Sequence, residues 1–177
     1  HSVGRVRLLA AVDCTGHGVP GAFMSLVGYN ALTHVTKVFT KPCKILDKLN
    51  SAALDVLRSE SSPSHLQDGM DLAMIAVDME KMELQFAGAN NPLYIVRDGE
   101  LHELKADKFA IASFEPGSKN YSEQTFALQT GDTVFASTDG FVDQFGGPSG
   151  KKFMRRRFRE LIIRVSMLPI SEHSEEF

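Results

Sequence analysis

The most informative segment of this protein is Val12-Asp13-Cys14-Thr15-Gly16-His17-Gly18-Val19-Pro20-Gly21-Ala22, in which an aspartate ends an apolar run and a glycine-rich turn follows. The run from Val6 to Val12 predicts a buried strand, so Asp13 is expected where that strand reaches the edge of its sheet. Gly16 and Gly18 let the backbone approach a ligand closely, as loops over a metal ion or a phosphate require. Asp13 is therefore a candidate metal ligand, although aspartate also commonly caps a turn or a helix start.

A second segment has the same design. The strand-forming residues 133–137 run directly into Thr138-Asp139-Gly140. Two carboxylates placed in this way can share a hard divalent cation, because oxygen ligands suit magnesium, manganese and calcium. As an isolated dipeptide, Asp139-Gly140 is also a common turn. The pair Asp13 and Asp139 indicates a metal-dependent hydrolase, with Gly140 supporting the second loop.

Residues near these motifs have two interpretations each. His17 could act as a general acid, but a role in holding its loop is favoured, because a histidine beside a metal-binding carboxylate need not touch the metal. Cys14 would need a basic neighbour to become a reactive thiol, and only His17 lies nearby in the sequence. Two further aspartates could hold the metal ligands in place without binding the metal themselves: Asp71, at a strand start, and Asp143, after the second motif. The alternative is that each only stabilises a turn or caps a helix. Asp68 has the same two interpretations as Asp71.

The composition describes an ordinary single domain. The chain has 177 residues, 43% of them hydrophobic, and its 22 acidic and 19 basic residues leave a net charge of -3. That balance gives no electrostatic case for nucleic acid or an anionic membrane, and no apolar stretch reaches the roughly 18 residues of a bilayer span. Cys14 and Cys43 are the only cysteines, so a reduced, cytoplasmic location is expected. The one basic concentration is a solvated helix face or a docking patch for an acidic or phosphorylated partner; its members are Lys151, Lys152, Arg155, Arg156, Arg157 and Arg159.

Periodicity predicts helices over residues 21–39 and 153–168, and between them a helix capped by Thr40 with Pro42 in its first turn. The residues expected to face inward are Met24, Val27, Ala31, Val35 and Val38 in the first, Ile45, Leu46, Leu49, Ala53, Val56 and Leu57 in the second, and Phe158, Leu161, Ile162 and Val165 in the third. The alternating middle, with an Asp98-Gly99 hairpin signal, predicts an antiparallel meander. Residues 145–152 have a loop composition, and residues 171–177 offer little core. This order predicts an α+β fold with helices packed on antiparallel sheets.

Three segments together resemble a known family. The stretch from Asp13 to Ala22 is similar to the Asp-x-[Ser/Thr]-Gly-His-Gly motif of the SpoIIE-like (RsbU-like) serine phosphatases, a bacterial branch of the metal-dependent PPM protein phosphatases. Ala87-Gly88-Ala89-Asn90-Asn91-Pro92 looks like the family's Ala-Gly-His-x-Pro-like turn without the histidine. Ser137-Thr138-Asp139-Gly140-Phe141-Val142-Asp143 looks like its Ser/Thr-Asp-Gly segment. Order and spacing agree, and the resemblance covers residues 6–168.

The resemblance implies a four-layer αββα sandwich, with two antiparallel sheets stacked face to face and helices outside. It also implies two manganese or magnesium ions that activate a bridging water for in-line attack on phosphoserine or phosphothreonine. In that scheme Asp13 bridges the metals, the backbone carbonyl of Cys14 is a further ligand, and Asp139 binds one metal. Phosphate monoesters hydrolyse extremely slowly unaided, so clustered positive charge is an ingredient that the reaction needs.

The resemblance further implies a phosphorylated bacterial signalling protein as substrate, for example an anti-sigma-factor antagonist of the STAS type. A fused N-terminal sensor or receiver domain and a homodimer are compatible with it. The family's upstream Gly-Gly-Asp segment and its final Asp-Asp motif are not found in this sequence. We therefore expect residues 1–177 to form one phosphatase domain that is incomplete at both ends. Two alternatives stay open: a catalytically weak or inactive module that binds a signalling partner, and a small-molecule phosphate hydrolase.

Overall fold

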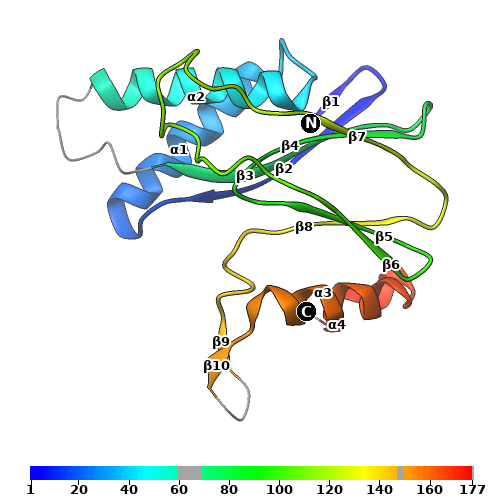
Figure 1. The fold of residues 1–177 in the computed structure, drawn as a ribbon. Coiled ribbons are helices and arrows are strands. Elements are labelled where there is room, and N and C mark those ends of the chain that lie inside the picture. Colours follow the sequence, from blue (N-terminus) through cyan, green and yellow to red (C-terminus); the bar gives the residue numbers. More distant parts are fainter. Residues whose placement is uncertain (60–68, 147–149, 177) are drawn as a thin grey trace.

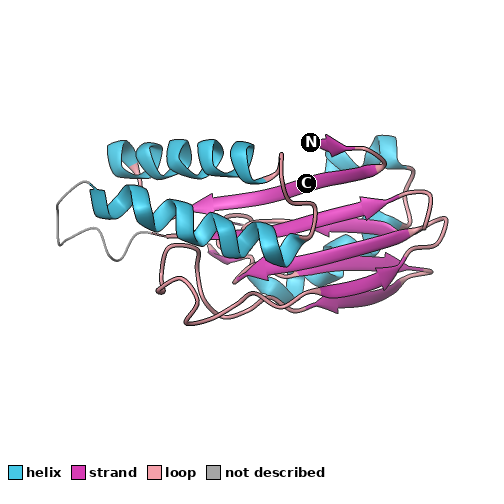
Figure 2. Cartoon of the chain, turned by 90° about the horizontal axis from the view of Figure 1, so that it is seen from above, coloured by secondary structure: helices cyan, strands magenta, loops and turns pink. Residues whose placement is uncertain are grey.

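Two antiparallel sheets lie face to face in the computed structural model of the protein, which describes residues 1–59, 69–146 and 150–176. The larger sheet has five strands in the order β1-β2-β3-β4-β7, which span Ser2–Val3, Val6–Cys14, Met70–Asp78, Glu83–Ala89 and Gln124–Ala127. The smaller sheet has three strands in the order β6-β5-β8, which span Glu100–Leu104, Leu93–Arg97 and Thr133–Ala136. Helices α1 (Gly18–Val35) and α2 (Pro42–Ser59) cover the outer face of the larger sheet, and α3 (Met154–Ser166) covers that of the smaller sheet (Figure 1). Seen from above, α1 and α2 lie side by side over the strands (Figure 2).

Strand β3 has apolar side chains on both faces, which is why a layer packs on each side of the larger sheet. Successive side chains of a strand point to opposite faces. Leu72 and Met74 therefore join the core beneath α1 and α2, whereas Ala73 and Ile75 join the core between the sheets.

Strand β5 repeats this arrangement in the smaller sheet. Leu93 and Ile95 join the core between the sheets, and Tyr94 and Val96 pack under α3. The rings of Tyr94 and Phe158 of α3 meet edge to face, with centroids 5.7 Å apart. Three cores therefore separate four layers, and the predicted αββα sandwich is confirmed.

Helix α1 begins at Gly18, before the predicted position 21, and ends at Val35 instead of 39. Pro20 is accommodated in the first turn, where a helix does not use the backbone N–H. Met24 and Val27 are buried as predicted. Val38 is 74% exposed, so its predicted inward position is wrong, because it lies beyond the last helical turn.

Helix α2 packs a continuous apolar stripe on the larger sheet. Ile45, Leu46, Leu49 and Ala53 are fully buried, as predicted. Val56 is 40% exposed, so its predicted burial is wrong. This residue lies on the outer side of the last turn of the helix, whereas its neighbour Leu57 in the same turn packs against the core.

Strand β2 is longer and less buried than the sequence predicts. It extends to Cys14, and Leu8 is its one fully buried residue, whereas Leu9 is 54% exposed. The reason is its place in the sheet: on its outer side, β2 pairs with the two-residue strand β1, which reaches only Val6 and Arg7.

The predicted single meander is wrong. Strands β3 and β4 pair, but the chain then leaves the larger sheet at Asn90-Asn91-Pro92, and β5 and β6 join β8 in the smaller sheet. The place next to β4 is taken by β7, from further along the chain. Alternation within a segment shows that it is a strand, but the sheet that it joins depends on contacts between distant segments.

Residues 145–152, predicted to be a loop, contain the paired strands β9 (Phe145–Gly146) and β10 (Lys151–Lys152). The C-terminal segment also forms structure, the turn η2 (Ile170–Glu172) and the short helix α4 (His173–Glu176). The His173 ring stacks on Phe135, with centroids 6.4 Å apart. Asp68 lies outside the described residues.

An ion pair between Arg97 of β5 and Asp132, in the turn before β8, predicts a specific pH dependence. Arg97 donates to both carboxylate oxygens of Asp132, at 2.8 and 2.7 Å, and these hydrogen bonds hold the pKa of Asp132 below its usual value. A lowered folded-state pKa contributes stability that is complete above the unfolded pKa of about 3.9 and disappears as the pH falls through the folded value. Asp132→Asn should therefore be less stable than the wild type at pH 7, and the difference should vanish at strongly acidic pH.

Urea unfolding of both proteins across a pH series measures this difference. The exposed Glu100, changed to glutamine, is the control for loss of one negative charge. A difference between wild type and Asp132→Asn that stays constant with pH would contradict the prediction.

Candidate functional site

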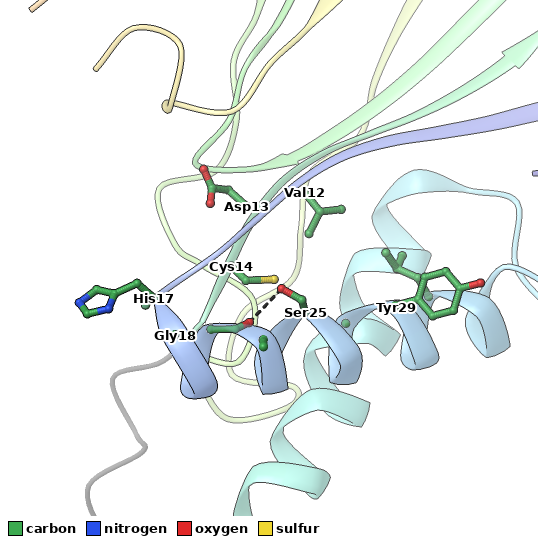
Figure 3. A pocket seen from close by; sticks show the side chains of 12 residues that line it. Val12, Asp13, Cys14, His17, Gly18, Ser25 and Tyr29 are labelled. Carbon is green, nitrogen blue, oxygen red and sulfur yellow. Dashed lines mark hydrogen bonds between the residues drawn. The ribbon is translucent and has the colours of Figure 1, made fainter. Parts of the chain in front are cut away.

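Strand β2 turns Asp13 toward the side of the smaller sheet. Its neighbours Val12 and Cys14 pack against the core beneath α1 and α2, so alternation places Asp13 on the opposite face. In Figure 3 the Asp13 carboxylate points away from α1, whereas the Cys14 thiol lies on the helix side, near Ser25. Asp13 is half-buried and belongs to the strand, rather than following it.

A row of polar side chains crosses β2 and β3 and ends beside β4. Asp13 pairs in register with Asp71 of β3, so both side chains lie on the same face. Asp71 Oδ1 accepts a hydrogen bond from Nδ2 of Asn90 at 2.8 Å. Asn90 follows β4 with a φ of 59°, a conformation that asparagine adopts more readily than most residues. Asn90 thus orients the Asp71 carboxylate beside Asp13.

Asp139 reaches the same end of the sandwich from the smaller sheet, in the turn after β8. Its carboxyl shares a side-chain hydrogen bond with Asp13. Partial burial raises the pKa of Asp139, and the charges of Asp13 and Asp143 raise it further. Two segments from opposite ends of the chain therefore bring their carboxylates together, as the metal hypothesis requires.

Asp143 lies one turn beyond Asp139. Its backbone N–H donates to the Asp139 carbonyl at 2.9 Å, and its exposed carboxylate pairs with Lys152 of β10 at 2.8 Å. Gln144 Nε2 donates to the Gly140 carbonyl at 3.0 Å, which closes the same turn. Asp143 therefore connects the Asp139 loop to the β9–β10 hairpin and adds negative charge near Asp139.

The turn after Asp13 leads directly into α1. Gly16 and Gly18 have φ of 96° and 66°, in the left-handed region that favours glycine. The Thr15 N–H donates to the Gly69 carbonyl at 2.9 Å, which ties the turn to β3. His17 precedes the helix without a side-chain capping hydrogen bond, and its ring points away from the other labelled side chains (Figure 3). The predicted role of His17 in holding the loop is therefore not supported by a capping hydrogen bond and stays a prediction.

A pocket of about 520 Å³ runs along this turn and along α1 as far as Leu32, with Asp13 and Tyr29 among its lining residues (Figure 3). Its volume lies within the roughly 300–1,000 Å³ of ligand-binding pockets. Ser25 Oγ donates to the Gly21 carbonyl at 2.9 Å, so this hydroxyl is held by the helix backbone.

Gly21→Ala should disturb the Asp13 turn directly. A Cβ at Gly21 would lie 2.7 Å from the carbonyl oxygen of Gly16 and 2.9 Å from its carbon, and both belong to backbone. We expect a loss of about 1–3 kcal/mol in the free energy of unfolding, as for other overpacked sites, although alanine is ordinarily the better helix former. Chemical denaturation measures the loss.

Gly146→Ala is the matched control, because a Cβ there meets no atom within 4 Å. The prediction is wrong if Gly21→Ala is as stable as this control.

The described residues provide a partial metal site. In residues 1–59, 69–146 and 150–176, no group of three or more histidine, cysteine, aspartate or glutamate side chains could hold a metal ion. The chain does bring Asp13 and Asp139 together, with Asp71 beside Asp13. Such a donor set suits Mg²⁺ or Mn²⁺, because these hard cations prefer oxygen and Mg²⁺ is usually bound through one or two carboxylates and water. A cation between the carboxylates would also relieve the repulsion that raises the pKa of Asp139. The residues present fit such an ion, and the Cys14 carbonyl as a ligand stays a prediction.

Two residues beside Asp139 carry no signal of a functional role in the sequence. Asn91 and Arg155 line a small cleft together with Asp139. In the sequence, Asn91 indicates only part of a turn, and Arg155 only part of the basic run. An asparagine pair before Pro92 signals a turn, but nothing in the sequence shows that one of the two amides is buried.

The chain matches the family described as Stage II sporulation protein E (SpoIIE) over residues 3–176. It is similar to the SiaA-PP2C domain of Pseudomonas aeruginosa, with 35% sequence identity and a TM-score of 0.84 over 99% of this chain and 68% of that chain. It also resembles the structure of the PP2C phosphatase domain and a regulatory-domain fragment of SpoIIE from Bacillus subtilis, with 16% identity and a TM-score of 0.67 over 98% of this chain and 50% of that chain. A third similar structure is the catalytic domain of the serine/threonine phosphatase PstP with two manganese ions, with 20% identity and a TM-score of 0.67 over 95% of this chain and 77% of that chain.

No curated protein sequence matches the chain. Among the helices of the described residues, none has both the length and the apolar character needed to cross a bilayer. The family match extends over nearly the whole chain, and the likeness to the SiaA-PP2C domain covers 99% of it. On this evidence the chain belongs to the SpoIIE family of PP2C-type (PPM) phosphatase domains.

Proposed function

We propose that the protein is a metal-dependent protein serine/threonine phosphatase in which Asp13 and Asp139 hold the divalent cations, two ions of Mn²⁺ or Mg²⁺. The observation that carries the proposal is the direct interaction of these two carboxylates at one end of the sandwich. The PstP structure contains two manganese ions, and a further structure with this fold, that of RsbX in complex with magnesium, has a TM-score of 0.62 at 13% identity. Such cations, when bound, supply positive charge at the phosphoryl group and lower the pKa of water.

The residues of the chain divide the remaining work. Asp13 presents its carboxylate from the larger sheet and Asp139 from the turn after β8, so the phosphoryl group would lie at the end of the sandwich between them. Asn90 holds Asp71 in place beside Asp13 by the 2.8 Å hydrogen bond. The pocket of about 520 Å³ lies along α1, on the side of β2 from which the Asp13 carboxylate points away, so we do not place the phosphoryl group in it.

The proposed substrate is phosphoserine or phosphothreonine on a bacterial signalling protein, such as an anti-sigma-factor antagonist of the STAS type. This assignment rests on the family, because the residues of the site recognise the phosphoryl group and not the identity of its carrier. A fused sensor or receiver domain and a cytoplasmic location belong to the same proposal.

Phosphate release by the full-length protein tests the proposal. Three peptides of one sequence, phosphorylated on serine, threonine or tyrosine, serve as substrates with Mn²⁺, with Mg²⁺ and with a chelator. We expect release from the phosphoserine and phosphothreonine peptides, loss of release with the chelator, and recovery when metal is restored. No metal-dependent release, together with no calorimetric signal for Mn²⁺ binding, would refute the enzyme and favour a module that binds a partner.

A further inference from the structure

A small cleft lies directly beside Asp139. It is formed by the turn before β5, the turn after β8 and the first turn of α3, and its lining includes Asn91, Ser137, Thr138, Asp139 and Arg155. Its volume is about 10 Å³, close to one water-sized probe. The cleft therefore admits a single oxygen atom, and any larger group must remain mostly outside it.

Asn91 gives the cleft a buried hydrogen-bond donor. The residue is only 3% exposed, and its Nδ2 has no hydrogen-bond partner among the described residues. A buried amide without a partner loses its hydration without replacement, so native structures rarely leave one. An oxygen atom in the cleft would supply the missing acceptor.

Arg155 gives the cleft a cation. Three of its basic neighbours are engaged: Lys152 with Asp143, Arg156 with Glu160 and Arg159 with Glu103. Arg155 is exposed and forms no ion pair with any residue that the structure describes. Arg155 and Asp139 line the same cleft, so the positive charge of Arg155 lies beside the Asp139 carboxyl.

We propose that Arg155 and Asn91 form the phosphate-recognition site of the protein. This inference rests on the proposed phosphatase function. One phosphoryl oxygen would enter the cleft and accept the Nδ2–H of Asn91, while the Arg155 guanidinium binds the oxygens that remain outside. Guanidinium groups match phosphate by paired, charge-assisted hydrogen bonds. The phosphorus would thereby be held against Asp139, so that Arg155 and Asn91 position the substrate instead of binding metal.

Arg155→Gln and Arg157→Gln make a matched pair for the test. Both residues are exposed on the same helix, both changes remove one positive charge, and only Arg155 lines the cleft. With the full-length protein and Mn²⁺, Arg155→Gln should raise the KM for a phosphoserine peptide and for p-nitrophenyl phosphate about tenfold or more, with a smaller change in kcat. The inhibition constant of inorganic phosphate should rise by a similar factor, whereas Arg157→Gln should leave all three constants within about twofold of the wild type.

Two further variants separate recognition from fold and from metal binding. Arg155→Lys should recover part of the loss, because it restores the charge without the fork of donors. Asn91→Asp, which replaces a donor by an acceptor of nearly equal shape, should also raise the inhibition constant of phosphate. Mn²⁺ affinity measured by calorimetry without phosphate should not fall in Arg155→Gln, and circular dichroism should show an unchanged fold.

The outcomes distinguish this inference from the function on which it rests. If the wild type turns over and Arg155→Gln resembles Arg157→Gln, the recognition site is refuted and the phosphatase stands. If the wild type does not turn over, calorimetry with inorganic phosphate in the presence of Mn²⁺ decides the matter. Phosphate binding that weakens in Arg155→Gln alone supports the site, and equal binding by both variants, or none by the wild type, overturns it.

Discussion

Asp13→Asn should lower Mn²⁺-dependent phosphate release by at least about a hundredfold, because residues that only support metal ligands already cost 10- to 100-fold when changed. The asparagine keeps the shape of the side chain but removes the charge that attracts the cation. Asp13 is also the group whose hydrogen bond and charge act directly on Asp139, so this change affects both carboxylates of the site. Steady-state phosphate release, together with Mn²⁺ titration by calorimetry, measures the loss of turnover and of metal affinity.

A second readout distinguishes a metal ligand from a residue that only supports the fold. In the metal-free protein, the charge of Asp13 opposes ionisation of Asp139, so its removal should leave the melting temperature unchanged or raise it. Asp98→Asn is the control, since it removes an exposed charge from the turn between β5 and β6. If Asp13→Asn retains the turnover of this control, Asp13 is not a ligand.

Phe86→Ala should cause the largest loss of stability, about 3–5 kcal/mol in the free energy of unfolding. Phe86 is fully buried between the two sheets, in one core with Ile75, Leu84 and Ile95. The packing at this point is close: a Cβ on Gly88 would lie 2.7 Å from the tip of the Phe86 ring. Loss of the ring would leave a cavity at the contact that holds the two sheets together. Since domains of this kind are stable by about 5–15 kcal/mol, the variant should be near the limit of folding.

Urea denaturation followed by circular dichroism measures this effect. Tyr29→Ala is the matched aromatic control, because Tyr29 is 69% exposed and its removal should change the free energy of unfolding by less than about 0.5 kcal/mol. Equal stability of the two variants would show that the core between the sheets does not carry the fold.

The elements that the sequence predicted well are those whose pattern is local and complete. Strand β3 is apolar on both faces, and the four residues of helix α3 predicted to face inward are buried. Each of these patterns lies within one continuous segment, so the sequence of that segment was enough to predict the element. The errors lie where a hydrophobic pattern continues past the end of its helix, or where a strand has little of another strand beside it. Val38 continues the helical spacing of α1 but lies beyond its end, and β2 reads as a buried strand although little of its outer edge is paired.

The candidate site was predictable in part for the same reason. Asp13 lies near the end of one recognisable strand and Asp139 follows another, a glycine-bearing turn comes after each, and the structure brings their side chains together. Their role as metal ligands stays a prediction. Asn91 and Arg155 carry no comparable signal, because an amide in a turn and one arginine among several are common on any surface. Only the folded structure, in which both residues line the same small cleft, indicates a functional role for them.

The linear sequence was enough to determine the features that depend on residues a few positions apart. These are the periods of the strands and helices and the glycine-bearing turns after two aspartates. The resemblance of those turns to known motifs also indicated the family. The packing of the whole chain settled which hairpin joined which sheet, how far β2 was buried, and that Asn91 and Arg155 lie beside Asp139. The difference is physical. Periodicity and turn chemistry act over one or two turns of backbone, whereas sheet pairing and clefts arise from contacts between distant segments that form together.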